Sequence, residues 1–313
     1  MSNKILVTDS LFIFDEHIKK LEAAGYEVER LDKPKASEDE LCEAVKGKVG
    51  YILGGVEEVT EKVIQAADEL KVISFTGADW QHFVTAEALV ANKGIAVSNT
   101  PGATTNAVAE FTLGLILCMA RDMIALSSLG ATQFKTVTGV QDLRIGIVGL
   151  GNIGTKVASL LKTIGVKEVV YWDRNKKEDR ERELGIAYVS LEELCNGCDV
   201  ITSHLSTAAG LILNAELISS TKDTVIFINA GAQPTFDYTA VRQKITSPNS
   251  SSRIGLDIHG CPEELKDLPA EKAFYTKSNT GFNTIQTLKI ISDMATDSLL
   301  NLLQSGNDQY KAN

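Results

Sequence analysis

The sequence lacks the features that mark several classes of protein. It has only five cysteines in 313 residues, at scattered positions, which argues against a disulfide framework and favours a reducing compartment. The most apolar run, residues 111–120, is too short to span a bilayer and ends at Arg121 and Asp122. The N-terminal segment reaches polar residues too early for a signal peptide. We therefore expect a cytoplasmic protein.

Positive charge and histidine are also scarce. Lysine and arginine number 31 against 41 aspartates and glutamates, the formal net charge is -10, and there are four histidines. A chain this acidic repels phosphate backbones and anionic lipid, so we expect neither nucleic acid nor membrane as a partner. Cys195 and Cys198 form one C-x-x-C pair with no second pair and no histidine in register. We interpret them as buried thiols at the end of a helix and expect no metal site.

What the sequence does contain is a regular alternation of short apolar runs and helical patterns. The apolar runs, rich in Val, Ile and aromatic residues, predict strands at 4–7, 26–31, 49–53, 72–75, 95–97, 145–148, 169–172, 200–203, 225–228 and 254–256. Helices are predicted at 16–24, 37–45, 60–67 and 85–91, with Ser37 and Thr60 as N-caps. This alternation predicts parallel sheets with helices on both faces.

Two longer helices divide the chain into domains. A helix at 105–127 joins two series of strands, and a last helix at 284–303 carries an apolar face that needs a partner. We expect this last helix to return to the first domain. Residues 1–100 and 283–313 then form one domain, and residues 101–282 form an inserted second domain. The predicted fold class is α/β, with two doubly wound parallel-sheet domains.

A glycine-rich turn stands at the start of the second domain's first strand-helix pair. Gly149, Gly151 and Gly154 follow an apolar strand and open a helix. The first glycine permits the tight turn, the second lets the backbone approach a pyrophosphate, and the third allows close packing of helix and strand. The helix start, with Asn152 and Ile153, offers unpaired N–H groups to an anion. The turn therefore indicates dinucleotide binding.

An acidic residue follows at the expected place. Asp173 ends the next predicted strand, close to the roughly 20-residue spacing expected of a ribose-binding acid. Such an acid accepts hydrogen bonds from the ribose hydroxyls and repels a 2′-phosphate, so NAD is favoured over NADP. Arg174, Lys176 and Lys177 come next and could weaken the preference for NAD. We interpret them instead as residues of a solvated edge.

With this turn in place, the whole chain resembles the D-isomer-specific 2-hydroxyacid dehydrogenases. The resemblance lies in the segments NTPGATTNAVAE (99–110), CDVITSHL (198–205), FINA (227–230) and GLDI (255–258), and in the returning C-terminal helix. It implies a flavodoxin-like substrate domain with an inserted Rossmann NAD-binding domain. It also implies a homodimer that pairs through the cofactor domain, and hydride exchange between a D-2-hydroxy acid and nicotinamide.

The family's catalytic residues are not matched. The resemblance implies an arginine that binds the substrate carboxylate, a histidine that acts as general acid/base, and a glutamate that hydrogen-bonds the histidine. Ala232 stands at the arginine position and Ser278 at the histidine position. Pro262 stands at the glutamate position, with Glu263 one residue late. The loop after His204 is also shorter than the family's and lacks its H-x-P. These losses together predict a changed active site.

The positions that meet the cofactor are better kept. The resemblance implies that Thr105 and His204 approach the cofactor and that Asp257 meets the nicotinamide carboxamide. It also implies a backbone contact near Asn229 and Ala230.

Other side chains could replace the lost acid/base. The candidates are His82, His204, His259 and Lys277. His82 lies in a loop where the family binds substrate through backbone N–H groups, here those of Gly77 and Ala78. Taken singly, each candidate is more readily interpreted as a structural or surface residue.

We expect His17 to be solvated, and Trp80 and Phe83 to pack in the core.

Three functions are compatible with these features. The leading hypothesis is an NAD-binding oxidoreductase that acts on a CH–OH or carbonyl group of a small molecule outside the simple 2-oxo acids. The alternative is a catalytically inactive, NAD(H)-binding regulatory pseudoenzyme. A third is an enzyme that uses bound NAD for non-redox or internally cycling chemistry. An enzyme needs a polar group near the nicotinamide C4 atom, whereas a regulator could fill that space with apolar side chains.

Overall fold

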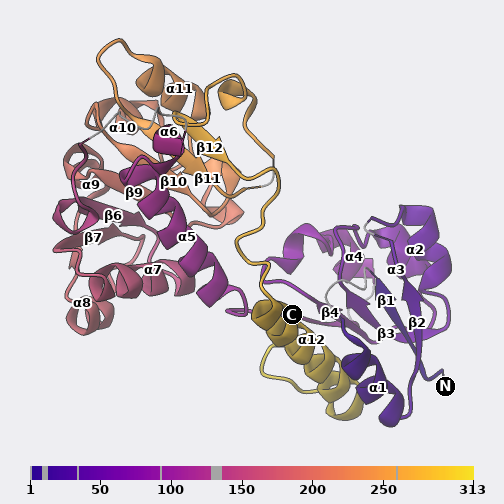
Figure 1. The fold of residues 1–313 in the computed structure, drawn as a ribbon. Helices are drawn as coiled ribbons and strands as arrows, with labels where there is room; N and C mark the ends of the chain where they lie inside the picture. The colour runs from indigo at the N-terminus through magenta and orange to yellow at the C-terminus, as the bar shows by residue number, and fades with distance from the viewer. Residues whose placement is uncertain (1, 9–12, 34, 92–93, 128–135, 259) are drawn as a thin grey trace. The chain divides into compact units, whose positions relative to one another are not determined.

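The computed structural model describes residues 2–8, 13–33, 35–91, 94–127, 136–258 and 260–313. The chain divides into two compact units, each with its own sheet (Figure 1). Unit 1 comprises Met1–Thr104 and Thr284–Asn313, and unit 2 comprises Thr105–Asn283.

Unit 1 contains a five-stranded parallel sheet in the order β2-β1-β3-β4-β5. This is the flavodoxin-like strand order. Its strands are β1 (Lys4–Thr8), β2 (Glu27–Leu31), β3 (Lys48–Leu53), β4 (Val72–Phe75) and β5 (Ala96–Ser98). Its helices are α1 (Asp15–Ala23), α2 (Glu38–Ala44), α3 (Glu61–Ala66), α4 (Ala86–Ala91) and α12 (Ile285–Ser305).

The two faces of this sheet are covered by different helices. Successive side chains of a strand point to opposite faces, so Ile5 packs on one side and Leu6 on the other. The Ile5 side holds a core shared with α1 and α12, and the Leu6 side holds a core shared with α2, α3 and α4. The Ser74 hydroxyl of β4 also donates a 2.8 Å hydrogen bond to the Ala295 carbonyl of α12. The last helix therefore completes the core of unit 1.

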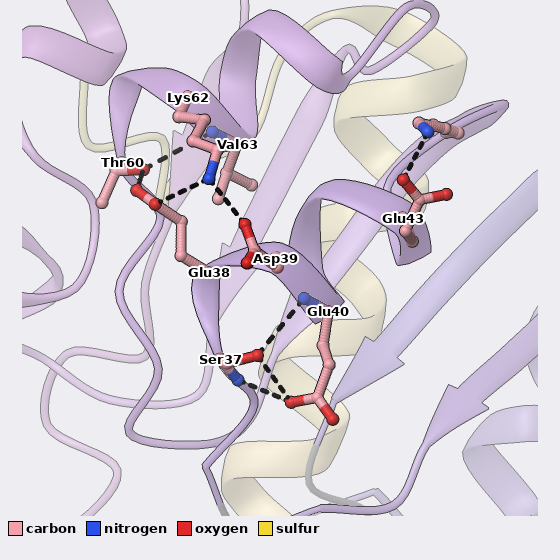
Figure 2. Close-up of polar contacts among 9 residues, drawn as sticks. Ser37, Glu38, Asp39, Glu40, Glu43, Thr60, Lys62 and Val63 are labelled. Carbon is pink, nitrogen blue, oxygen red and sulfur yellow. Dashed lines mark hydrogen bonds and ion pairs between the residues drawn. The ribbon is translucent and has the colours of Figure 1, made fainter.

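The predicted N-caps of α2 and α3 are confirmed (Figure 2). Ser37 accepts a hydrogen bond from the Glu40 N–H, and the Glu40 carboxylate accepts one of 2.8 Å from the Ser37 N–H. This reciprocal pair satisfies two N–H groups that the helix itself leaves unpaired. The Thr60 hydroxyl likewise accepts from the Val63 N–H at the start of α3.

A group of acidic side chains at the start of α2 is compensated by a lysine. Lys62 of α3 lies 3.2 Å from the Glu38 carboxylate and 2.6 Å from the Asp39 carboxylate (Figure 2). These side chains are exposed, and exposed ion pairs contribute only about 0–1 kcal/mol. The contacts orient two neighbouring helix starts and do not form a ligand site.

Unit 2 contains a seven-stranded parallel sheet in the order β12-β11-β10-β9-β6-β7-β8. This is the Rossmann order with one further strand. The strands are β6 (Arg144–Val148), β7 (Glu168–Trp172), β8 (Ala187–Tyr188), β9 (Val200–Ser203), β10 (Ile226–Asn229), β11 (Arg253–Leu256) and β12 (Ala273–Tyr275). The helices are α5 (Thr105–Ala120), α6 (Met123–Ser127), α7 (Asn152–Thr163), α8 (Glu178–Leu184), α9 (Leu191–Gly197), α10 (Ala215–Ser220) and α11 (Tyr238–Thr246). The predicted fold class is confirmed.

Two predictions about elements were wrong in detail. The single helix predicted at 105–127 is two helices, α5 and α6, because Asp122 adopts a left-handed φ of 56° between them. The short strands β8 and β12 at the two edges of the sheet were not predicted.

One histidine also lies elsewhere than predicted. His17 is 1% exposed instead of solvated, because α1 packs against α12. Its Nε2 atom lies 2.9 Å from the Asp293 carboxylate of α12.

Other predictions about the interior are confirmed. Trp80 packs in the core of unit 1, as predicted. Cys195 and Cys198 are fully buried at the end of α9, and burial raises the pKa of each thiol to about 12. They are therefore inert thiols.

No helix among the described residues is long and apolar enough to cross a membrane.

Candidate functional site

The predicted cofactor residues of unit 2 follow the carboxyl ends of its strands. Gly149 follows β6, Asp173 follows β7, His204 follows β9, Ala230 follows β10 and Asp257 follows β11. In a parallel sheet these ends share one edge. Ligands of open α/β sheets bind there, at the point where the strand order reverses. In unit 2 this point lies between β6 and β9.

The glycine turn has the geometry that the sequence predicts. Gly149 has a φ of +94°, and its N–H donates a 2.8 Å hydrogen bond to the Trp172 carbonyl. A Cβ atom on Gly154 would lie 2.1 Å from the Gly149 carbonyl oxygen, so only glycine fits there. A Cβ on Gly151 would meet no atom within 4 Å, so the turn is open on that side.

The start of α7 leaves donors unpaired beside this open side. Gly151 is the N-cap and supplies no side-chain hydrogen bond. The N–H groups of Asn152 and Ile153 in the first turn therefore have no partner within the helix. Together with the positive end of the helix dipole they suit a pyrophosphate.

Asp173 is attached to the same turn. One carboxylate oxygen accepts a 2.9 Å hydrogen bond from the Leu150 N–H, and the other accepts a 3.3 Å bond from the Asn175 N–H. A carboxylate oxygen has a second lone pair, so both oxygens can still accept from ribose hydroxyls. The turn and the acid are thus fixed relative to each other before a ligand binds.

Two buried polar atoms at the end of β9 have no partner. The Ser203 hydroxyl and the His204 Nδ1 atom are buried without a hydrogen bond. A buried group left in this state costs about 1–3 kcal/mol, which a ligand with polar atoms would recover. His204 adjoins the glycine turn, because a Cβ on Gly149 would lie 3.2 Å from the His204 carbonyl oxygen. These orphaned atoms and the open turn fit a dinucleotide.

His204 is poorly suited to proton transfer. Its Nε2 atom lies 3.0 Å from the Thr202 hydroxyl, and burial lowers the pKa of the ring from 6.5 to about 3. The ring is therefore neutral near pH 7 and has no second proton to donate. A hydrogen-bonding role beside the cofactor suits it better than acid/base catalysis.

The turn that contains Ala232, the predicted arginine position, is ordered by Asn229. This side chain is fully buried, donates to the Ala232 carbonyl (3.2 Å) and the Tyr238 hydroxyl (2.9 Å), and accepts from the Gly231 N–H (2.9 Å). The Ala232 N–H donates to the Leu205 carbonyl at 2.9 Å. The turn is thus held in shape by hydrogen bonds that do not involve the Ala232 side chain.

Asp257 holds the 276–281 loop, in which the sequence predicts Ser278 at the family's histidine position. It is 1% exposed and accepts hydrogen bonds from the Thr276 hydroxyl (2.7 Å), the Thr280 N–H (3.0 Å) and the Gly281 N–H (2.8 Å). A Cβ on Gly281 would lie 2.6 Å from its carboxylate. The resemblance implies a nicotinamide contact for Asp257, and the structure adds this positioning role.

The remaining candidates of unit 2 are more exposed. Lys277 and Ser278 lie exposed in that loop, and Lys277 forms no ion pair with another described residue. Glu263 is exposed and paired with Lys266, whereas Pro262 is buried. Thr105 is the first residue of α5 and is partly buried. His259 lies outside the described residues.

The predicted substrate residues lie at the end of β4 in unit 1. The carbonyls of Gly77 and Ala78 accept hydrogen bonds from the Thr100 N–H (2.9 Å) and the Asn99 amide (2.7 Å). Their own N–H groups donate no hydrogen bond to a described residue. His82 ends the short 3-10 helix η2 (Trp80–His82) and is exposed.

One buried acid was missed by the sequence reasoning. Glu57 follows β3 in unit 1 and is 0% exposed. One carboxylate oxygen accepts a 3.1 Å hydrogen bond from the Tyr51 hydroxyl, and the other has no partner. Burial and the Glu57 charge raise the pKa of Tyr51 well above its ordinary value, so Tyr51 remains a donor. The sequence did contain a signal, an acidic residue that follows a predicted strand and two glycines. The same pattern is typical of an exposed turn, so it did not indicate burial.

Comparison with known proteins identifies the family. The sequence profile described as D-isomer specific 2-hydroxyacid dehydrogenase, NAD binding domain, matches residues 113–281. A Staphylococcus aureus protein named as a 2-hydroxyacid dehydrogenase is 29% identical over 306 residues, which cover 94% of this chain and 95% of that protein. The prediction of NAD as cofactor is confirmed by the family match.

Solved structures agree in fold. A Thermus thermophilus protein superposes with a TM-score of 0.81 at 28% identity, covering 98% of this chain and 99% of its own. The NAD+-bound 3-phosphoglycerate dehydrogenase of Entamoeba histolytica also has a TM-score of 0.81, at 22% identity, covering 100% and 99%. The chain belongs to the D-isomer specific 2-hydroxyacid dehydrogenase family, and residues 113–281 match its NAD binding domain.

Proposed function

We propose that the protein is an NAD-dependent oxidoreductase that acts on a CH–OH or carbonyl group of a small molecule other than a simple 2-oxo acid. One observation carries the proposal. The glycine turn and Asp173 have the geometry of a dinucleotide site, while the family resemblance places Ala232, Pro262 and Ser278 at the catalytic positions. The protein is therefore equipped for the cofactor but not for the family's usual substrate.

The cofactor roles follow from the contacts above. The N–H groups of Asn152 and Ile153 bind the pyrophosphate, and Asp173 accepts from the ribose hydroxyls. Ser203 and His204 complete their hydrogen bonds on the cofactor.

We expect a second group of residues at the nicotinamide end. The family resemblance implies that Thr105 and the backbone of Asn229 and Ala230 would contact it. Asp257 holds the 276–281 loop at this edge of the sheet.

The reaction requires a hydride acceptor and a base. Bound NAD would supply the hydride acceptor for oxidation of the alcohol to a carbonyl. A side chain of this protein would have to accept the proton of the alcohol hydroxyl. His82, His259 and Lys277 are the candidates for that base, and the low pKa of His204 makes it the weakest of the four.

The second candidate function is an NAD(H)-binding regulatory pseudoenzyme. It is favoured by the Asp257 carboxylate, whose hydrogen bonds fix the loop where the family resemblance places Ser278 at the histidine position. A fixed loop serves a protein that senses the cofactor as well as one that turns over a substrate.

Titration and assay test the proposal. Calorimetry should show NADH binding clearly tighter than NADPH binding. Reduction of pyruvate, glyoxylate, hydroxypyruvate and phenylpyruvate should be negligible. Loss of a bidentate cation costs about 2–5 kcal/mol, and loss of the acid/base a further factor of roughly 10²–10⁴. Normal turnover of any of the four would show that Ala232 and Ser278 do not stand at the catalytic positions. NADH binding without turnover in a broad carbonyl screen would favour the regulator.

We also propose a homodimer. Met123 and Leu126 of α6 expose 55% and 39% of their surface, and the adjoining helix α5 is strongly apolar. An isologous interface between two copies would bury such a surface. Light scattering at micromolar concentration should give twice the mass of 33.8 kDa, and a single-chain mass would contradict the proposal.

A further inference from the structure

Strand β5 lies at one edge of the sheet of unit 1. The Ala96 N–H donates a 2.8 Å hydrogen bond to the Lys71 carbonyl, on the side of the neighbouring strand β4. The main-chain groups of successive residues point to alternate sides of a strand, so those of Ile95, Val97 and Asn99 point away from β4. Unpaired groups along such an edge are a template for pairing with another chain. The outer side of β5 therefore needs a cover.

Residues 310–313 supply this cover as an antiparallel segment. The Ala312 N–H donates a 2.7 Å hydrogen bond to the Val97 carbonyl, and the Asn99 N–H donates one of 3.4 Å to the Tyr310 carbonyl. The Ala312 side chain packs against the core that β5 shares with α2, α3 and α4. The segment thus joins both the edge and the core of unit 1.

The side chain of Asn313 continues the pairing. Its Oδ1 atom accepts a 2.8 Å hydrogen bond from the Val97 N–H, and its Nδ2 atom donates one of 2.9 Å to the Ile95 carbonyl. A carboxamide carries the same kinds of donor and acceptor as a peptide group. Asn313 therefore pairs with β5 as one more main-chain residue of a neighbouring strand would.

Asp308 anchors this segment to α12. One of its carboxylate oxygens accepts hydrogen bonds from the Ser298 hydroxyl at 2.9 Å and from the Tyr310 N–H at 2.7 Å. The other oxygen accepts one of 2.8 Å from the Asn301 amide. These contacts fix the direction in which the chain leaves the helix, so that the following residues run along β5.

The chain leaves β5 in a turn that holds the predicted substrate residues. The Asn99 side-chain amide donates a 2.7 Å hydrogen bond to the Ala78 carbonyl, and the Thr100 N–H donates one of 2.9 Å to the Gly77 carbonyl. Trp80 follows closely and is 8% exposed. Contacts at the outer edge of β5 are thus connected, through Asn99, to the backbone that leads into Trp80.

We propose that residues 308–313, here called the strap, are a conformational device that orders the Gly77–Ala78 backbone through β5 and Asn99. Release of the strap leaves the outward groups of β5 to water and frees the Asn99 side chain to leave the Ala78 carbonyl. Every contact in this chain of effects lies within unit 1. The inference goes beyond the proposed oxidoreductase function and does not depend on it.

Two measurements on the full-length protein follow the strap and the turn separately. Amide-resolved hydrogen exchange of the Ala312 N–H reports the strap, because this group loses its Val97 acceptor on release. Acrylamide quenching of Trp80 reports the backbone beyond the turn. A Trp172→Phe background leaves Trp80 as the single tryptophan, since the chain has two.

A strap-release variant combines Asp308→Ala with Asn313→Ala. Neither substitution touches the Val97 carbonyl, so faster exchange of the Ala312 N–H shows that the strap has left β5. We expect that exchange to rise by at least about tenfold, and the quenching of Trp80 to rise with it. Exchange of the Ile52 amide, in the central strand β3, should stay as in the wild type, which separates local release from loss of stability of the whole unit.

Two further variants complete the test. Asn307→Ala is the matched control, because it makes the same change at an exposed asparagine whose amide bonds the Ser305 carbonyl at 3.4 Å, and it should alter neither measurement. Asn99→Ala cuts the connection beyond the strap. It should raise the quenching of Trp80 while leaving the exchange of the Ala312 N–H unchanged.

Each contrary result overturns a named part of the inference. Unchanged exchange of the Ala312 N–H in the strap-release variant would show that Asp308 and Asn313 do not hold the strap. Faster exchange with unchanged quenching of Trp80 would show that the strap does not order the turn, and unchanged quenching in Asn99→Ala would remove Asn99 from the connection. Should the double variant fail to fold by circular dichroism, Asn313→Ala alone gives the same two readings. Failure to bind NADH would count against the proposed function and leave these readings unaffected.

Discussion

We propose two separable tasks for Asp173, and two substitutions distinguish them. Its carboxylate accepts a hydrogen bond from the Leu150 N–H in the glycine turn, and we expect its charge to oppose a 2′-phosphate on the cofactor. Asp173→Asn removes the charge but keeps an acceptor oxygen for the turn. Asp173→Ala removes both. The two variants should therefore agree in cofactor preference and differ in stability.

The magnitudes follow from the burial of the turn. Leu150 is only 3% exposed, so Asp173→Ala leaves its N–H unpaired in the interior, at a cost of about 1–3 kcal/mol in the free energy of unfolding. Asp173→Asn replaces a charge-assisted hydrogen bond with a neutral one of roughly half the strength, which costs about 1 kcal/mol or less. Both variants lose the charge, so the ratio of NADPH to NADH dissociation constants should fall by roughly tenfold in each.

The stability assay can follow unit 2 alone. Trp172 adjoins Asp173 and belongs to unit 2, whereas Trp80 belongs to unit 1. Denaturant unfolding in a Trp80→Phe background, followed by tryptophan fluorescence, therefore reports the unit that carries the substitution. Calorimetry gives the two dissociation constants. An unchanged NADPH-to-NADH ratio in Asp173→Asn would refute the ribose argument, and equal stability of the two variants would refute the turn argument.

Three further predictions concern unit 2. Asp257→Ala should speed hydrogen exchange of the Thr280 and Gly281 amides by at least about tenfold, because both amides lose their acceptor; unchanged exchange would contradict the anchoring role. Gly154→Ala should destabilise the unit, since its Cβ would lie 2.1 Å from a carbonyl oxygen, whereas Gly151→Ala should fold normally but weaken NADH binding. Burial holds the pKa of His204 at about 3, against 6.5 when exposed, so the unfolded chain binds the extra proton in that range. Stability should therefore rise with pH between about 3 and 6.5, by up to about 1.4 kcal/mol per unit, and His204→Gln should flatten that slope in a pH series of denaturant melts.

Most of the fold could be predicted from local patterns. Apolar runs bounded by turns fix the central strands, and Ser37 and Thr60 cap the helices that their sequence positions indicate. The edge strand β8 was missed because both of its residues are exposed and carry no apolar pattern. The break between α5 and α6 was missed because the left-handed backbone of Asp122 is a single-residue event inside an otherwise helical pattern.

The candidate site was predictable where backbone geometry defines it. The glycine turn requires particular residues at particular spacings, so the sequence alone locates it. Glu57 and Asp257 are different, because what matters is how deeply each carboxylate is buried and which donors reach it. Those donors come from residues such as Tyr51 and Thr280, and only the folded chain brings them together. His17 was misplaced for the same reason, since its partner Asp293 lies far along the sequence.

The return of α12 to unit 1 sets an order of events during synthesis. Unit 2 is one continuous segment and can fold as soon as it leaves the ribosome. Unit 1 cannot, because the apolar face that includes Ile5 and Val7 is covered by Ala295 and Leu299, which are synthesised only after the whole of unit 2. Until then a nascent chain carries an uncovered sheet face, the kind of surface that chaperones bind and that aggregates when it is left exposed. Truncation before α12 should therefore yield an insoluble product even though the whole of unit 2 is present.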